Sequence, residues 1–139
     1  MTTITTPGAA QLKELLPLCS VRHMTPGAPG VWYLGRNFLG WSGSSLGNPF
    51  IMGRDGTRHE VIEKYRLRLR AIIERSEQGD TLTKQEEKIM KELKAIAHRL
   101  KENGFRRQIL LGCWCSPLPC HVEVVRDAVI RILLPGRPV

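Results

Sequence analysis

The chain has 139 residues, of which 42% are hydrophobic and 24% are charged, and its formal net charge is +8. This length and composition are typical of a single globular domain over residues 1–139 and exclude a disordered or fibrous chain. No apolar run approaches the roughly 20 residues that a membrane span needs, and the first 18 residues lack the pattern of a secretory signal. We therefore expect a cytoplasmic protein. In that reducing compartment, cysteines bind metal or react rather than form disulfides.

The basic excess is concentrated in two segments. Residues 54–75 carry seven basic groups against four acidic ones, and residues 84–107 carry eight against four. Such an excess attracts phosphate-bearing partners. The interspersed acids favour a plainer interpretation, in which both segments are solvated helix faces. Aromatic residues make up only 6% of the chain, which gives little support to stacking on single-stranded nucleic acid.

The first predicted strand follows a polar N-terminal region. Residues 1–20 start with threonine- and proline-containing sequence, which predicts a mobile segment, and their apolar run at 12–19 fits a short helix. After a turn rich in proline and glycine, residues 31–35 have the β-forming composition of a buried strand. Arg36 comes directly after this strand, where its planar side chain could clamp a phosphate or make a structural ion pair.

A long glycine-rich loop follows, over residues 37–57. It holds five glycines and contains Gly47-Asn48 followed by proline. Glycines let the backbone approach a ligand closely and present N–H groups to an anion. The Asn48 side chain could contact such a ligand. The alternative is a surface loop that needs glycine only for its turns, with Asn48 bonded to its own backbone. Neither the Walker pattern nor the dinucleotide pattern is present, so the glycines alone do not indicate a nucleotide.

Two helices are predicted next, and each starts at a capping box. Thr57 and Glu60 form the first box, and Thr83 and Glu86 form the second. Apolar residues repeat at helical spacing behind both boxes, with a break at 78–80 and an end at 103–104. We expect the two helices to pack as an antiparallel pair, which could also dock a protein partner through residues 59–103.

A second strand and a third helix complete the predicted fold. Residues 108–115 are apolar on both faces, which suits a central parallel strand covered by helices. Pro119 is well placed to open an amphipathic helix over residues 121–134, which Pro135 stops. We therefore expect an α/β fold, a small three-layer sandwich with a short, mostly parallel sheet and about three main helices.

Cys113, Cys115, Cys120 and His121 form the most informative cluster in the sequence. Residues two apart on a strand point to the same face, so Cys113 and Cys115 project side by side. The short turn that follows brings Cys120 and His121 back over the carboxyl end of the strand, at the start of the last helix. Ligands of open α/β sheets favour this edge, and a helix start favours a thiolate or another anion.

Three interpretations of this cluster are open. The four side chains could bind one zinc ion in a tetrahedral site. Alternatively, Cys120 and His121 could be catalytic, with a Cys120 thiolate activated by the helix start. In the third interpretation the cysteines are buried and act as small apolar residues.

Cys19 stands apart from this cluster, and we expect it to be a core or surface thiol. We expect His59 and His98 to be solvated.

The chain also resembles a known family in several motifs taken in order. These are Val31-Trp32-Tyr33-Leu34-Gly35-Arg36, Leu46-Gly47-Asn48-Pro49-Phe50, Gly56-Thr57-Arg58, Val61-Ile62-Glu63-Lys64-Tyr65 and the segment from Leu111 to His121. They are similar to the domain of unknown function family 4326 of bacteria and phages. The Cys-x-Cys-x-Pro-x-x-Cys-His ending also resembles, more distantly, the domain of unknown function family 488. Residues 77–103 look like a charged helical insertion relative to the family.

The resemblance implies that Arg36, Asn48 and the Cys–His cluster belong to one site, but it implies no activity. We expect a metal-stabilised domain, with zinc as the metal, that binds a phosphate-bearing ligand such as a nucleotide or nucleic acid. Gly47, Asn48 and Arg36 would contact the ligand. The alternatives are a cysteine-dependent enzyme that acts on a small nucleotide-like or glycosidic substrate, and a protein-interaction module.

Overall fold

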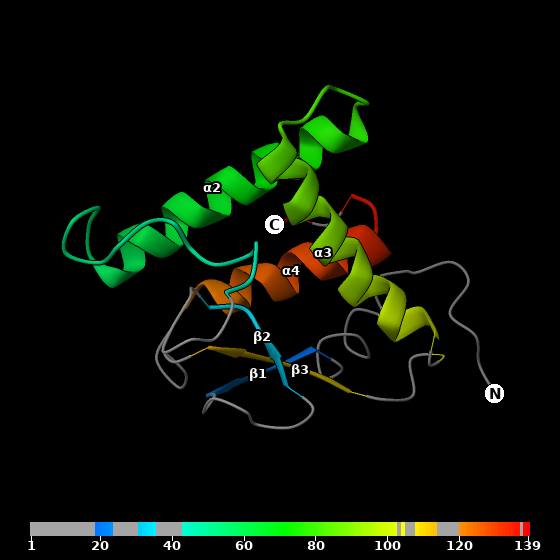
Figure 1. Ribbon diagram of the computed structural model, residues 1–139, viewed down its shortest axis with the longest axis horizontal. Helices are drawn as coiled ribbons and strands as arrows, with labels where there is room; N and C mark the ends of the chain where they lie inside the picture. Colours follow the sequence, from blue (N-terminus) through cyan, green and yellow to red (C-terminus); the bar gives the residue numbers. More distant parts are fainter. Residues whose placement is uncertain are drawn as a thin grey trace.

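The computed structural model describes residues 19–23, 31–35, 43–102, 104, 108–113, 120–136 and 138–139. The expected mobile segment and short helix before residue 19 lie outside these residues. Six elements follow in order: β1 (Cys19–His23), β2 (Val31–Tyr33), α2 (Arg58–Glu77), α3 (Lys84–Glu102), β3 (Ile109–Cys113) and α4 (His121–Leu133). The small α/β fold expected from the sequence is confirmed (Figure 1).

The three strands form one parallel sheet in the order β1-β3-β2. β3 is the central strand, as its apolar sequence predicts, since it has a hydrogen-bonded neighbour on each side. In register, Cys19 pairs with Ile109 at one end of β1, and His23 pairs with Cys113 at the other. β1 itself was not predicted, because its five residues include serine, arginine and histidine and show no clean alternation.

Both predicted capping boxes are present. The Thr57 hydroxyl accepts from Glu60 N, while the Glu60 carboxylate accepts from Thr57 N. Thr83 and Glu86 make the same reciprocal pair at the start of α3. Between the helices the chain reverses at Gly79, which has φ +76°. Each box satisfies two backbone N–H groups that the helix leaves without partners, and this fixes both helix starts.

The prediction that α2 and α3 pack along each other is wrong. The two helices diverge from their connecting turn, and both pack mainly on α4. α4 lies between α2 and the sheet, whereas α3 runs past α4 toward the sheet (Figure 1). α4 is therefore buried on both sides: Val124 and Ile130 are buried along with the stripe that the sequence pattern predicts. Its sequence has to be apolar on more than one face, because a helix in the middle layer meets solvent on little of its surface.

The described helices thus lie on one side of the sheet, with α4 over the sheet and α2 beyond α4, while α3 runs from the α2–α3 turn past α4 toward the sheet (Figure 1). The core includes residues of the sheet and of these three helices, and its largest fully buried members include Leu111 on β3, Val124 on α4 and Leu93 on α3. Within the described parts of the chain, no helix is long and apolar enough to cross a membrane.

Candidate functional site at the carboxyl edge of the sheet

The carboxyl ends of the strands and the start of α4 meet at one edge of the sheet. β3 ends at Cys113, opposite His23 of β1. Beside them the chain continues from β2, and Leu34 N donates to Gly112 O over 2.9 Å. α4 begins at this edge with Cys120 as its N-cap, so the predicted placement of the Cys–His pair at the strand ends is confirmed.

Cys120 is held as a helix cap. Its backbone is extended, with φ −151° and ψ 174°, and its Sγ accepts the backbone N–H of Val122 at 3.4 Å. The side chain is 3% exposed. A sulfur that accepts a backbone N–H at a helix start lies where the partial positive charge of the helix favours a thiolate.

His121 is fixed by the end of β2. Its Nε2 lies 2.6 Å from the carbonyl oxygen of Leu34, and the ring is 8% exposed. A carbonyl oxygen can only accept, so Nε2 carries the proton and donates it. When the ring is neutral, its lone pair is therefore on Nδ1. Metal-binding histidines commonly have this arrangement, in which the distal N–H is held by a carbonyl or a carboxylate.

Tyr65 of α2 connects the site to the glycine-rich loop. Its ring packs edge-on against His121, with centroids 5.3 Å apart and an interplanar angle of 78°. Its hydroxyl donates to Leu46 O over 2.6 Å. Burial raises the pKa of Tyr65, so the hydroxyl stays protonated and remains a donor. The sequence pattern placed this tyrosine in the apolar face of a helix, and its position within one of the family-like motifs was the only sign of a further role.

The loop lies against the end of β2 at Gly47. A Cβ at this position would lie 3.2 Å from Gly35 O and 3.2 Å from Ser44 O, so a side chain here would push two backbone segments apart. Ser44 N also donates to Gly35 O at 2.9 Å. Close backbone packing therefore accounts for glycine at position 47.

Asn48 is 7% exposed, and both the oxygen and the nitrogen of its side-chain amide make hydrogen bonds within the chain. Its Oδ1 accepts from Phe50 N at 2.9 Å, and its Nδ2 donates to Val61 O at 3.3 Å. The first bond is the local turn bond that asparagine often makes, and the second ties the loop to the first turn of α2. The expected contact of Asn48 with a ligand stays a prediction.

Glu92 of α3 holds the other side of the loop, a role that no sequence pattern indicates. Its carboxylate accepts from Ser44 Oγ at 2.5 Å, from Ser45 N at 3.1 Å and from Ser45 Oγ at 2.7 Å. It also accepts the indole N–H of Trp32, on β2, at 3.0 Å. One carboxylate thus joins α3, β2 and the loop through four hydrogen bonds. In the sequence alone, Glu92 cannot be distinguished from the exposed acids of the same charged helix.

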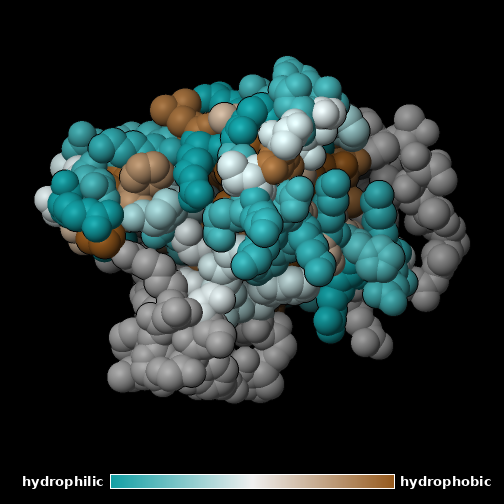
Figure 2. Space-filling model, turned by 45° about the horizontal axis from the view of Figure 1, so that its top comes forward, coloured by the Kyte–Doolittle hydropathy of each residue, from teal (hydrophilic) through white to brown (hydrophobic). Residues whose placement is uncertain are grey.

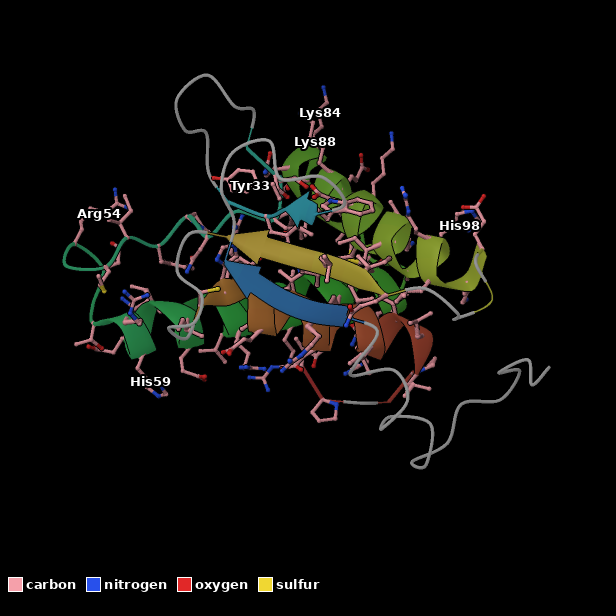
Figure 3. The ribbon with its side chains drawn as sticks, turned by 90° about the horizontal axis from the view of Figure 1, so that it is seen from below. Tyr33, Arg54, His59, Lys84, Lys88 and His98 are labelled. Atoms are coloured by element: carbon pink, nitrogen blue, oxygen red, sulfur yellow. The ribbon has the colours of Figure 1, made fainter. Side chains whose placement is uncertain are left out.

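Part of the predicted site lies outside the described residues. This applies to Arg36 and Cys115, and Cys113 is described only by its backbone at the end of β3. Among the residues that are described, no group of three or more potential metal ligands occurs. His59 and His98 are exposed, as predicted (Figure 3). The structure therefore brings Cys120, His121 and the end of β3 together, and the four-ligand arrangement stays a prediction.

Comparison with known proteins bears on the whole chain. A family model described as Domain of unknown function (DUF4326) matches residues 20–131, which is most of the sequence. The chain belongs to this family. α3 falls between the ends of the matched range, and the insertion expected over residues 77–103 stays a prediction. No curated protein and no solved structure matches. The likeness to family 488 stays a prediction.

Proposed function

We propose that Cys113, Cys115, Cys120 and His121 bind one zinc ion, and that this centre stabilises a binding site for a phosphate-bearing ligand at the carboxyl edge of the sheet. The observation that carries the proposal is the conformation of the Cys120–His121 pair. The sulfur accepts Val122 N–H, and the imidazole is fixed by Leu34 O with its lone pair on Nδ1. Zinc ligands need this kind of support to hold them in place.

The burial of the pair favours a metal ligand over an exposed nucleophile. Cys120 is 3% exposed and His121 is 8% exposed. Reactive thiols lie in partly exposed surroundings, whereas structural zinc sites are closed. A buried thiol beside a buried imidazole is accordingly better explained by a shared ion.

The phosphate half of the proposal is supported by the position of Arg36 and by charge. Arg36 follows Gly35 in the sequence. The Gly35 carbonyl accepts a hydrogen bond from Ser44 N of the loop, and the carbonyl of the preceding residue, Leu34, accepts one from His121. The chain also carries a net charge of +8, which raises the local concentration of anions. A phosphate ligand would thus meet an arginine fork next to the Cys–His centre.

Metal content measured by elemental analysis tests the zinc centre. Protein purified under reducing conditions should contain about one zinc per chain, as one closed four-ligand site requires. Cys120→Ser should lower this content strongly, because a neutral hydroxyl is a poor zinc ligand. Cys19→Ser is the matched control, since Cys19 begins β1 at the opposite end of the strand from His23. Wild-type protein without stoichiometric metal would rule out the centre.

Calorimetric titration with ATP, used as a polyphosphate probe, tests the ligand half. Arg36→Gln should weaken binding by about tenfold, which is the loss expected for one charge-assisted contact. Lys64→Gln removes the same charge from an exposed position on α2 and should leave the affinity within about twofold. Equal effects of the two substitutions would contradict a role for Arg36.

A second candidate function is an enzyme with a Cys120 thiolate nucleophile that acts on a small nucleotide-like or glycosidic substrate. The position of Cys120 as the N-cap of α4 favours it, because a helix start lowers the pKa of a thiol placed there. This function predicts that one thiol reacts rapidly with iodoacetamide near pH 6–7. Slow labelling of native protein, with Cys120 modified only after unfolding, would exclude it.

A further inference from the structure

The exposed side of α3 carries a large excess of positive charge. Two acids and six Lys or Arg residues are exposed along it: Glu87 and Glu102 against Lys84, Lys88, Lys91, Lys94, Arg99 and Lys101. We call these six basic residues the α3 basic face. Six minus two leaves a net charge of +4 among these exposed residues, whereas the whole helix has six basic groups against four acids. The exposed side of α3 is therefore more positive than the helix as a whole.

The α3 basic face is not neutralised within the described part of the molecule. The ion pairs found there use arginines of the loop, α2 and α4 instead: Arg54, Arg66, Arg75, Arg126 and Arg131. The other two acids of α3 are already engaged, Glu86 by Arg75 and Glu92 by the loop. The lysines of α3 therefore differ from Arg66 and Arg75 of α2, which are matched by nearby acids.

The face is long enough to span several phosphates. Lys84 and Lys101 are 17 positions apart, which corresponds to about 25 Å along a helix. Lys84 and Lys88 extend from one end of α3 and His98 from the other, all away from the body of the protein (Figure 3). Hydrophilic side chains dominate the helical surface, and the exposed large hydrophobic residues of the described chain, Met52 and Leu67, lie outside α3 (Figure 2).

One end of the α3 basic face adjoins the loop of the candidate site. Ser45 Oγ lies 3.3 Å from Lys88 O, and the Glu92 carboxylate binds the same serine. The same loop packs on the end of β2 through Gly47. A polyanion that lies along α3 would therefore pass beside the loop that borders the Cys–His centre.

We infer that the α3 basic face is a docking surface for the phosphate backbone of double-stranded DNA. Lysines act on phosphates as point charges and need no particular base sequence. α3 has no aromatic residue, so the face offers no platform on which single-stranded bases could stack. The inference deepens the proposed function, because it names the phosphate-bearing ligand, but it does not require the zinc centre.

Fluorescence anisotropy with a labelled 20-base-pair duplex of arbitrary sequence tests the inference. We compare Lys88→Gln/Lys91→Gln with the control Arg54→Gln/Lys64→Gln. Each pair removes two positive charges and lowers the net charge from +8 to +6. The control side chains already bond to the chain, Arg54 to Asp55 and Lys64 to the Asp55 carbonyl. Glutamine is a good helix former, so α3 should persist.

The α3 variant should bind at least about tenfold more weakly near 50 mM salt, and its slope of log affinity against log salt should be smaller by about 1.8, as expected for two lost phosphate contacts. The control should keep the wild-type slope. Equal losses in both variants would overturn the inference. So would tighter binding of a single strand, or displacement of the duplex by polyglutamate at equal charge, which would indicate an acidic protein partner.

The inference and the proposed function can fail separately. If Arg36→Gln weakens ATP binding while Lys88→Gln/Lys91→Gln leaves duplex binding unchanged, the docking surface is wrong and the ligand site stands. If Arg36→Gln has no effect on ATP and the α3 variant loses the duplex, the docking surface stands without the ligand site.

Discussion

Tyr65 shows how much of the site depends on single polar atoms in apolar surroundings. Its position in a helical stripe was predictable from spacing alone, and it is buried as the stripe requires. Its hydroxyl, however, reaches Leu46 O, and its ring supports His121. Periodicity gives only the direction in which a side chain points, and it does not identify the partner, because that partner comes from a loop 19 residues earlier in the chain.

Tyr65→Phe tests this contact. The ring and its packing on His121 remain, while the Leu46 carbonyl loses its donor, so the free energy of unfolding should fall by about 1–2 kcal/mol. Urea denaturation measures the change. Tyr33→Phe is the matched control, with a smaller expected loss because Tyr33 is only half-buried and water can reach its surroundings. Equal stability of Tyr65→Phe and wild type would show that the hydroxyl bond contributes nothing net.

His121 was predictable as a site residue from its place beside Cys120, but its tautomer was not. The proton on Nε2 follows from the carbonyl of Leu34, which comes from another strand end 87 residues away. The sequence could thus identify which residues gather at the edge. The orientation of each ring depends on backbone groups that have no sequence signature.

At the scale of elements, the helix starts were the best predicted features, and β1 was the worst because the sequence pattern did not predict it. Capping boxes are local chemistry, so Thr57 and Thr83 marked their helices correctly. β1 has only five residues, and its pairing with β3 is decided by neighbours distant in sequence. The packing of α2 and α3 mainly on α4 likewise depends on the whole core.

Glu92→Gln tests the attachment of the loop to α3. Glutamine keeps one accepting oxygen but replaces the other with a donor, so about two of the four hydrogen bonds at this carboxylate should be lost. We expect the free energy of unfolding to fall by about 1.5–3 kcal/mol, the range for hydrogen bonds to a charged group. Amide hydrogen exchange at Ser45 should also speed up, because its N–H is a donor to Glu92.

Glu87→Gln is the control for this substitution, since Glu87 is exposed on the same helix. It should change stability by less than about 0.5 kcal/mol, as surface substitutions usually do. Exchange at Ser45 as slow in Glu92→Gln as in wild type would contradict the role of Glu92.

The junction between α2 and α3 carries a pH dependence. Hydrogen bonds from Arg75 and from Thr83 N lower the pKa of Glu86 to about 2. A carboxyl group whose pKa is depressed in the folded state stabilises the fold above its unfolded pKa, which is about 4.3, and that contribution is lost as the pH falls toward 2. The contribution is therefore full at neutral pH.

Glu86→Gln should consequently be less stable than wild type above about pH 5, and the difference should shrink as the pH is lowered from 4 toward 2. Thermal unfolding across this range measures it, with Glu87→Gln as the control that lacks the Arg75 contact. A difference that is the same at pH 7 and pH 3 would show that the ionised form of Glu86 is not what stabilises the junction.

At the scale of the whole molecule, the chain combines a thin parallel sheet with helices stacked on one side of it in the described region (Figure 1). The α/β class and the central position of β3 followed from composition and apolar runs. The order of the layers did not, because α4 reads as an amphipathic surface helix until its two buried sides are seen. The Cys–His pair joins this middle helix to the strand ends, so a metal bound there would connect α4 to the sheet.

Zinc X-ray absorption spectroscopy of the reduced native protein tests this centre most directly. If Cys113, Cys115, Cys120 and His121 share one ion, the spectrum will show about three sulfur ligands near 2.3 Å and one nitrogen ligand near 2.0 Å. Any zinc that Cys120→Ser still binds should have one sulfur ligand fewer, and Cys19→Ser should keep all three. A shell of oxygen and nitrogen alone, or protein that retains no metal under reducing conditions, would contradict the proposal that the strand end and the start of α4 are joined by a metal.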